Sequence, residues 1–212
     1  MRLPRPETCY RLFCEMKMLD HIAAHSIQVC RVATFLADQL GYADQPGKRR
    51  LIRSAALLHD ITKTRSFETS ENHAATGARL LAERGYPEVA RIVGQHVRLD
   101  AYPGVGIPGE AEIVNYADKR VLHDRIAPLQ DRMSYIVQKY GQDVANRERI
   151  LWLWKKTEHM ECRIFRSLSF APADLAGLLN ADGFAREFAA YRRVCRERHG
   201  ASEQVPPPDS SP

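Results

Sequence analysis

The stretch Leu57-Leu58-His59-Asp60-Ile61-Thr62-Lys63 places a histidine and an aspartate at the end of an apolar helical run. From Leu51 onward, apolar side chains recur at helical spacing, so that His59 shares their inward face. A charge that is buried without a partner costs several kcal/mol, so an inward histidine or aspartate needs a hydrogen bond, an ion pair or a metal. The stretch therefore predicts a helix that delivers polar ligands into a core.

Helical spacing continues through most of the chain on both sides of this stretch. Gly41 is placed to end the first long helix, Ser70 to cap the third helix, and Gly85 to end that third helix before Pro87. The expected helices lie near residues 18–40, 47–59, 70–84, 87–96, 110–123, 128–140, 143–166 and 182–198. No segment predicts a strand, and the fold class is all-α.

Residues 97–109 are too rich in glycine and proline for regular structure. Loops of this composition beside a site often shape it. We expect this segment to act as a lid.

The length of 212 residues and a composition of 44% hydrophobic and 27% charged residues are those of an average globular chain. The expected organisation is a lead-in at 1–17, a helical domain at 18–125, a C-terminal helical extension packed on it at 126–198, and a tail at 199–212. The proline-rich tail has few apolar residues and is expected to be disordered.

The N-terminus has no run apolar enough for a signal peptide, and no later segment resembles a membrane span. The cysteines are odd in number and lack a Cys-x-x-Cys pair, which favours free thiols in a reducing compartment: Cys9, Cys14, Cys30, Cys162 and Cys195. We therefore expect a cytoplasmic protein.

The formal charge of +5 comes from basic residues that are spread along the chain without a recognition motif. This pattern suits a protein that handles a phosphorylated small molecule or nucleotide better than one that binds nucleic acid. The sequence does not indicate an oligomeric state.

Five ionisable residues lie on the apolar faces of successive predicted helices, and Asp60 directly follows one of them. A single metal site accounts for all six: His25, His59, Asp60, His73, His96 and Asp118. Imidazole and carboxylate ligands suit Mn, Fe, Co, Ni or Zn, and the lack of an inward cysteine favours a catalytic over a structural site. Such a metal activates a bound water and polarises a phosphoryl oxygen. Since no protein nucleophile is evident, attack by hydroxide on the metal is expected.

The order His25, then His59-Asp60, then Asp118 resembles the His, His-Asp, Asp signature of the HD superfamily. The run at residues 57–63 is similar to the family segment LLHDIGK, with Thr62 where glycine is common. The resemblance covers about half of the chain. It implies a helical bundle in which these four residues bind the metal, and an enzyme that hydrolyses a phosphomonoester, phosphodiester or nucleotide.

His73 and His96 occupy the order of extra histidines found in two-metal subgroups of the family. They are expected either to bind a second metal or to contact substrate phosphate as imidazolium donors around one metal. Gly77, one turn after His73, is expected to leave room beside it.

Lys63 follows His59 by one helical turn and is expected to neutralise charge on the substrate phosphate. Asp60 and Lys63 are thus the expected catalytic residues. Lys119 is set aside because adjacent helical residues point in different directions. His21, near a helix start, and His159, in a charged run, are expected at the surface.

Two other functions remain open at this stage. Some members of the superfamily use a di-iron site to activate oxygen. A site of this kind can also bind a nucleotide without turnover, as a sensor.

Overall fold

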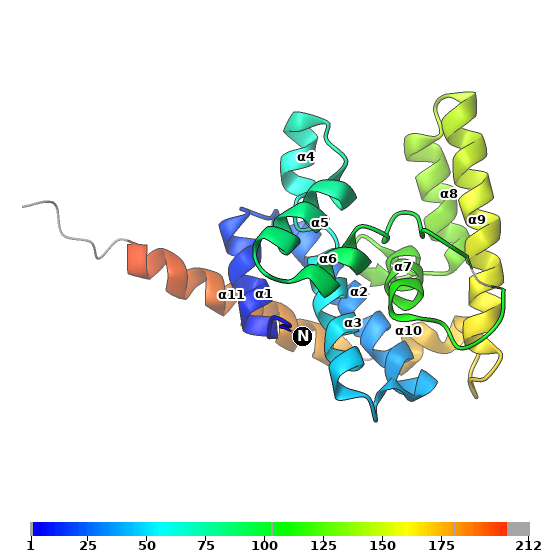
Figure 1. Cartoon of the computed structure of the whole chain (residues 1–212), viewed down its shortest axis with the longest axis horizontal. Coiled ribbons are helices and arrows are strands. Elements are labelled where there is room, and N and C mark those ends of the chain that lie inside the picture. Colours follow the sequence, from blue (N-terminus) through cyan, green and yellow to red (C-terminus); the bar gives the residue numbers. More distant parts are fainter. Residues whose placement is uncertain (1, 103, 180, 203–212) are drawn as a thin grey trace, which may run out of the picture.

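The computed structural model describes residues 2–102, 104–179 and 181–202, with only the backbone for 199–202. The chain forms a helical bundle (Figure 1) whose elements are α1 (Pro6–Glu15), α2 (Asp20–Ala37), the π-helical turn η1 (Asp38–Tyr42), α3 (Pro46–Leu58), α4 (Lys63–Thr69), α5 (His73–Glu83), α6 (Pro87–Val93), α7 (Glu110–Lys119), β1 (Val121–Leu122), β2 (Arg125–Ile126), α8 (Leu129–Tyr140), α9 (Val144–Phe165), the 3₁₀ turn η2 (Pro172–Asp174), α10 (Leu175–Leu178) and α11 (Ala181–Ser202). The all-α fold class is confirmed.

The core is centred on α2, which packs against α3, α7 and α11. Nearly every side chain of α2 from Ile22 to Ala33 is buried, and many are small, so neighbouring helices can cover it on several sides. As predicted, Gly41 breaks the helical geometry at the end of this segment, with a φ of 84° that suits glycine.

Several boundaries differ from the sequence predictions because local capping decides them. Ser70 is not the N-cap of α5, as predicted, but the C-cap of α4, in the left-handed conformation. Asn72 is the cap of α5, where its side chain accepts a hydrogen bond from the amide of Ala75 at 3.1 Å. Helix α7 ends at Lys119 and not near residue 123 as predicted, and a short antiparallel hairpin, β1 with β2, follows although no strand was predicted.

The first 17 residues, expected only as a lead-in, contain α1. This helix buries Cys9, Tyr10, Leu12 and Phe13 in the main core. The sequence prediction missed this ten-residue helix, although a proline at the first position is a typical helix start. The predicted disordered tail lies outside the described residues from 203 onward, and α11 runs through Ser202.

The α8–α9 hairpin projects from the bundle (Figure 1) and has a small apolar cluster of its own, formed by Leu129, Met133 and Ile150. Helix α4 projects from the same side of the bundle. Within the described parts of the chain, no helix combines the length and apolar character that a membrane span requires.

The free-thiol prediction is wrong for Cys14 and Cys195, which form a disulfide between α1 and α11 with their Cα atoms 5.7 Å apart. Cys9, Cys30 and Cys162 are free. The paired cysteines are separated by 181 residues, so no local spacing could indicate the bond. The cysteine pattern thus no longer supports a reducing compartment.

Candidate metal centre

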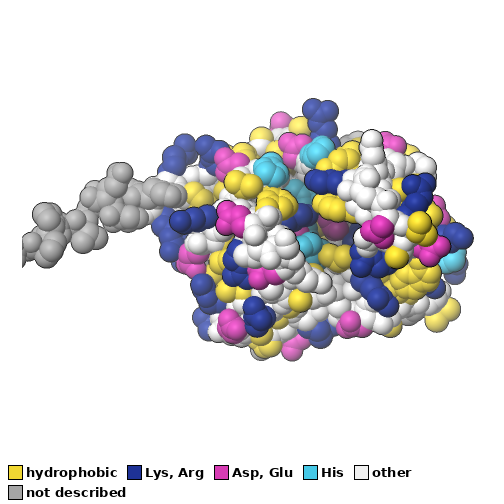
Figure 2. All heavy atoms as spheres, turned by 90° about the horizontal axis from the view of Figure 1, so that it is seen from above, with side chains coloured by type: hydrophobic (Ala, Val, Ile, Leu, Met, Phe, Trp, Pro, Cys, Tyr) yellow, Lys and Arg dark blue, Asp and Glu magenta, His cyan; other side chains and the backbone are white. Residues whose placement is uncertain are grey.

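The predicted ligands converge although they come from different elements. His25 lies in α2, Asp118 lies in the last turn of α7, and the remaining residues lie at helix ends: His59 and Asp60 in the turn after α3, His73 at the start of α5, and His96 in the turn after α6. Figure 2 shows histidine side chains around a hollow in the surface, with basic side chains beside it. The structure therefore places all six residues in one site.

One half of the site joins α2, α3 and α7. His25 Nε2 lies 3.0 Å from Asp118 Oδ1. His59 Nε2 lies 3.7 Å from the same oxygen and 3.4 Å from Asp60 Oδ2. His25, His59 and Asp118 are all buried and together could hold a metal ion.

The other half gathers around Asp60 Oδ1. His73 Nε2 lies 3.2 Å from this oxygen, His96 Nε2 lies 3.5 Å from it, and the two Nε2 atoms are 3.1 Å apart. His59, Asp60 and His96 form a second group that could hold a metal, so the two groups share His59.

Backbone carbonyls fix the tautomers of the three buried histidines. His25 Nδ1 donates to the carbonyl of His123, His59 Nδ1 to that of Ala56, and His96 Nδ1 to that of Val93, each at 2.8 Å. A neutral imidazole has one N–H, so in each ring Nε2 is left as the lone-pair nitrogen that faces the site. Metal-binding histidines are commonly held in this way.

The buried acceptor atoms of the site fit a bound cation. His59 Nε2 and Asp60 Oδ1 are buried and have no hydrogen-bond partner among the described residues. Burial lowers the pKa of His59, but the carboxylates of Asp60 and Asp118 outweigh it and raise that pKa overall, so the site attracts positive charge. A metal among these acceptors satisfies atoms that are otherwise buried at a cost, and the donor set of imidazoles and carboxylates fits a divalent transition metal.

The carboxylate of Asp60 is ionised despite its burial. Burial favours the neutral acid, but the charge of Lys63 holds the pKa of Asp60 well below its usual range. Burial lowers the pKa of His96 to about 4 and also lowers that of His25. The site therefore presents anionic carboxylates and, at His25 and His96, neutral imidazoles, the protonation states that bind metals.

Lys63 reaches the site by a route that differs from the prediction. Helix α3 ends at Leu58, and α4 starts only at Lys63, so the helix does not persist through the turn. The turn itself brings Lys63 Nζ to 2.8 Å from Asp60 Oδ2, and 24% of the lysine side chain is exposed. Its ammonium thus lies between the carboxylate and the solvent.

Two further cations contact Asp118: Lys119, which was not expected at the site, and Arg132, which no sequence pattern indicated. Lys119 is buried and donates to Asp118 Oδ2 at 3.1 Å and to the carbonyl of His96 at 2.5 Å. Arg132 Nη2, from α8, lies 3.7 Å from Asp118 Oδ1. Burial opposes ionisation, but the charges of Lys119 and Arg132 hold the pKa of Asp118 well below its usual range.

Gly77 does not leave room beside His73, contrary to the prediction. A Cβ atom there would lie 3.3 Å from side-chain atoms of Ile61 and Val93, so the glycine lets α5 pack closely on its neighbours. Thr62, which replaces the common glycine, donates to the carbonyl of His73 at 2.8 Å and thereby ties the His-Asp turn to α5.

The other residues considered in the sequence lie outside the six-residue site. His21 and His159 are exposed, as predicted. His159 and Cys162 line a separate pocket of about 320 Å³ between α9 and residues near Tyr102.

The profile of the HD domain family matches residues 22–121, which contain all six site residues. Residues 22–121 are an HD domain. This family assignment suggests a metal-dependent hydrolase.

Curated relatives extend this comparison. The chain is 30% identical over 158 residues to a tRNA (cytidine(56)-2'-O)-methyltransferase of Picrophilus torridus, covering 68% of this chain and 44% of that protein. It is 34% identical over 78 residues to ribonuclease Y of Rubrobacter xylanophilus and 35% identical over 78 residues to that of Desulforamulus reducens, covering in each case 36% of this chain and 14% of the relative. The chain thus spans less than half the length of these relatives, and no solved structure gives a significant match.

Proposed function

We propose that this chain is a phosphohydrolase that uses one or two divalent transition metal ions to cleave a phosphoester of a nucleotide or small phosphorylated metabolite. The main support is that His25, His59 and His96 each direct an Nε2 lone pair toward ionised carboxylates. Backbone carbonyls that accept from Nδ1 fix this tautomer in each ring. Such a set has little use except to bind a cation.

His25, His59, Asp60 and Asp118 would hold the first metal, in agreement with the HD signature. When bound, the metal would lower the pKa of a coordinated water and polarise a phosphoryl oxygen. Lys119 and Lys63 keep the two carboxylates ionised and correctly oriented through their hydrogen bonds. Lys63 can also turn its partly exposed ammonium toward an incoming phosphate and neutralise charge that develops there.

His73 and His96 would act next to Asp60 Oδ1, the carboxylate oxygen that does not contact Lys63. The 3.1 Å between their Nε2 atoms, next to Asp60 Oδ1, supports a shared second metal. In the one-metal alternative, His73 donates a hydrogen bond to the substrate phosphate. The side chain of His73 is 24% exposed, which suits either role.

The names of the relatives supply a further hint about substrates. Ribonuclease Y and the tRNA methyltransferase are both named for RNA chemistry. This supports the inclusion of nucleotide-containing phosphodiesters among the substrates to be tested.

The test combines metal analysis with hydrolysis. Purified protein loaded with Mn, Fe, Co, Ni or Zn is assayed for metal content and for hydrolysis of a chromogenic phosphodiester, nucleotides, dinucleotides and sugar phosphates. We expect about two metals per chain in the wild type, loss of both metal and activity in His59→Ala, and loss of about one metal in His73→Ala. His21→Ala is the matched control, since His21 lies in the same part of the chain but is exposed.

Retention of full metal content by His59→Ala would refute the ligand assignment. If the wild type binds one metal, and His73→Ala keeps that metal but loses substrate affinity, His73 binds the substrate phosphate. Oxygen consumption by iron-loaded protein without hydrolysis would replace the proposal by an oxygenase. Nucleotide binding without turnover under any metal would replace it by a sensor.

A further inference from the structure

A line of basic and aromatic side chains starts at the candidate metal centre and follows α8 outward. Arg132, Tyr135 and Lys139 are spaced three and four residues apart, so they share one face of the helix. Arg132 is at the site, since its Nη2 lies 3.7 Å from Asp118 Oδ1. We name these three residues the α8 track; the track lies outside the HD domain match at residues 22–121.

Arg132 has unused binding capacity at the site. Its side chain is only 12% exposed, and its buried Nε has no hydrogen-bond partner among the described residues. A guanidinium in this state is suited to bind a phosphate in bidentate fashion. Lys63, with its Nζ 2.8 Å from Asp60 Oδ2, supplies a second cation beside the other carboxylate of the site. A phosphate at the metal centre would therefore meet two cations.

Beyond Arg132, the track continues with an aromatic side chain, Tyr135, and then a basic one, Lys139. The ring of Tyr135 lies 5.4 Å from that of His123, edge to face, and His123 supplies the carbonyl that orients His25. Lys139 Nζ donates to Tyr135 Oη at 3.2 Å and lies 5.5 Å from the ring centre of Tyr140, which is 49% exposed. Aromatic rings that alternate with cations are the pattern that binds single-stranded nucleic acid, through base stacking and phosphate contacts.

We propose that the α8 track binds a single-stranded nucleic acid whose phosphodiester enters the metal centre, with Arg132 on that phosphate, a base on Tyr135 and an adjacent phosphate on Lys139. The proposal rests on the proposed function, because it names the substrate class of the same site. It departs from the expectation, drawn from the scattered basic residues, that the protein handles a small phosphorylated molecule or nucleotide and not a nucleic acid. The seven residue-to-residue steps from Arg132 to Lys139 span about 10 Å of helix, or about three stacked bases at about 3.4 Å each.

Binding is tested by fluorescence anisotropy on the full chain without added metal. The probes are labelled single-stranded oligouridylate and oligothymidylate of about ten nucleotides and a duplex of the same length. We expect tighter binding of single strands than of duplex, and about ten-fold weaker binding by Tyr135→Ala but not by Tyr135→Phe, which keeps the ring. Lys139→Ala should reduce the slope of log affinity against log salt by about 0.7, since it removes one phosphate contact.

Lys155→Ala is the matched control, because Lys155 is an exposed lysine of the same hairpin that lies outside the track. Circular dichroism checks that each variant keeps its helix content. Comparison of the RNA and DNA probes identifies the preferred sugar. Tighter binding of either single strand than of the duplex supports the proposal.

The proposal is overturned if Tyr135→Ala and Lys139→Ala bind the single strands as the wild type does, or if duplex binds as tightly as single strands. A wild type that hydrolyses a small chromogenic diester but does not bind the oligonucleotides would overturn the track and leave the proposed hydrolase intact. Track-dependent binding of single strands in a protein that binds no metal would support the track and refute the hydrolase.

Discussion

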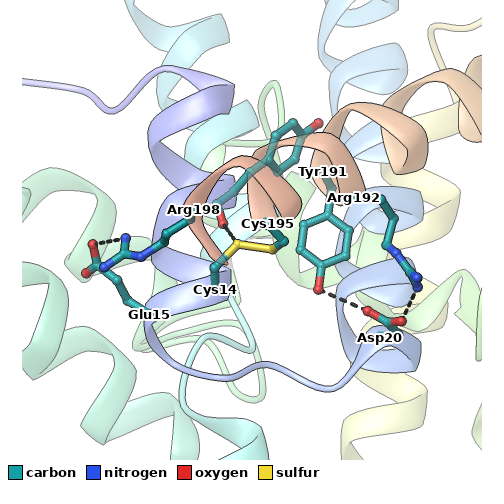
Figure 3. Close-up of a disulfide and its surroundings, with 8 residues drawn as sticks. Cys14, Glu15, Asp20, Tyr191, Arg192, Cys195 and Arg198 are labelled. Atoms are coloured by element: carbon teal, nitrogen blue, oxygen red, sulfur yellow. Dashed lines mark hydrogen bonds and ion pairs between the residues drawn. A yellow bond between two sulfur atoms is a disulfide. The ribbon is translucent and has the colours of Figure 1, made fainter. Parts of the chain in front are cut away.

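The disulfide between Cys14 and Cys195 offers a perturbation whose size can be worked out from the structure. It joins α1 to α11 (Figure 3) and closes most of the chain into a loop, since its two cysteines have a sequence separation of 181. The entropy that such a cross-link removes from the unfolded chain grows with the logarithm of loop length and amounts to about 5 kcal/mol at this length. This value is the upper limit for the loss of unfolding free energy when the bond is removed.

Other contacts between the two helices remain without the bond. The ring of Tyr191 packs on those of Tyr10 and Phe13 at centroid distances of 6.1 and 5.7 Å. Arg198 pairs with Glu15 at 2.8 Å. We therefore expect Cys195→Ser to fold with α11 in place, to lose about 3–5 kcal/mol of stability, and to melt about 6–20 °C below the wild type.

Calorimetry under non-reducing conditions measures this difference, with Cys14→Ser as a second variant and Cys162→Ser as a control that removes an exposed free thiol. Thiol titration of the unfolded, unreduced wild type should detect three of the five cysteines, because two are paired. Equal melting of the wild type and Cys195→Ser, or five reactive thiols in the wild type, would refute the reasoning.

Three further changes test packing, charge and loop anchoring. Gly77→Ala should destabilise the protein by about 1 kcal/mol in urea unfolding, because the added methyl group overpacks against Ile61 by more than the gain in helix propensity returns; a stabilised variant would contradict this. Hydrogen bonds from two arginines lower the pKa of Glu15, so its stabilising contribution is present above its usual pKa of 4.5 and is lost as the pH falls. Glu15→Gln should therefore lose less stability than the wild type between about pH 5 and pH 3, an effect kept small by solvent screening, and equal acid profiles would argue against the pairing. Tyr42→Phe removes a 2.9 Å hydrogen bond to the carbonyl of Pro108 and should cost about 1 kcal/mol. Limited proteolysis should then cut the loop that holds Pro108 faster, and unchanged cleavage would mean that this bond does not anchor the loop.

Helical periodicity in the sequence was sufficient to predict most of the helices and an inward position for five of the six site residues, all except Asp60. This information is local: a residue's phase relative to its apolar neighbours reports which face of its own helix it occupies. His25, His59 and Asp118 could therefore be grouped into one site before any helix was placed, because each needed a partner inside the same core.

Helix caps and turns were harder to predict from the sequence, because several neighbouring residues could form the same side-chain hydrogen bond to the backbone. Asn72 rather than Ser70 caps α5, and the chain turns at Asp60 before a new helix starts at Lys63. Lys63 meets Asp60 all the same, because a tight turn and a helical turn both bring residues three apart together.

Contacts between distant segments were decided only by the tertiary structure. The bond between Cys14 and Cys195 and the approach of Arg132 to Asp118 leave no mark in local spacing, since they depend on the angles and offsets at which helices pack. The tautomers of His25 and His59 were equally hidden, because each is set by a backbone carbonyl, a group that every residue carries and that only the folded chain brings to the right imidazole.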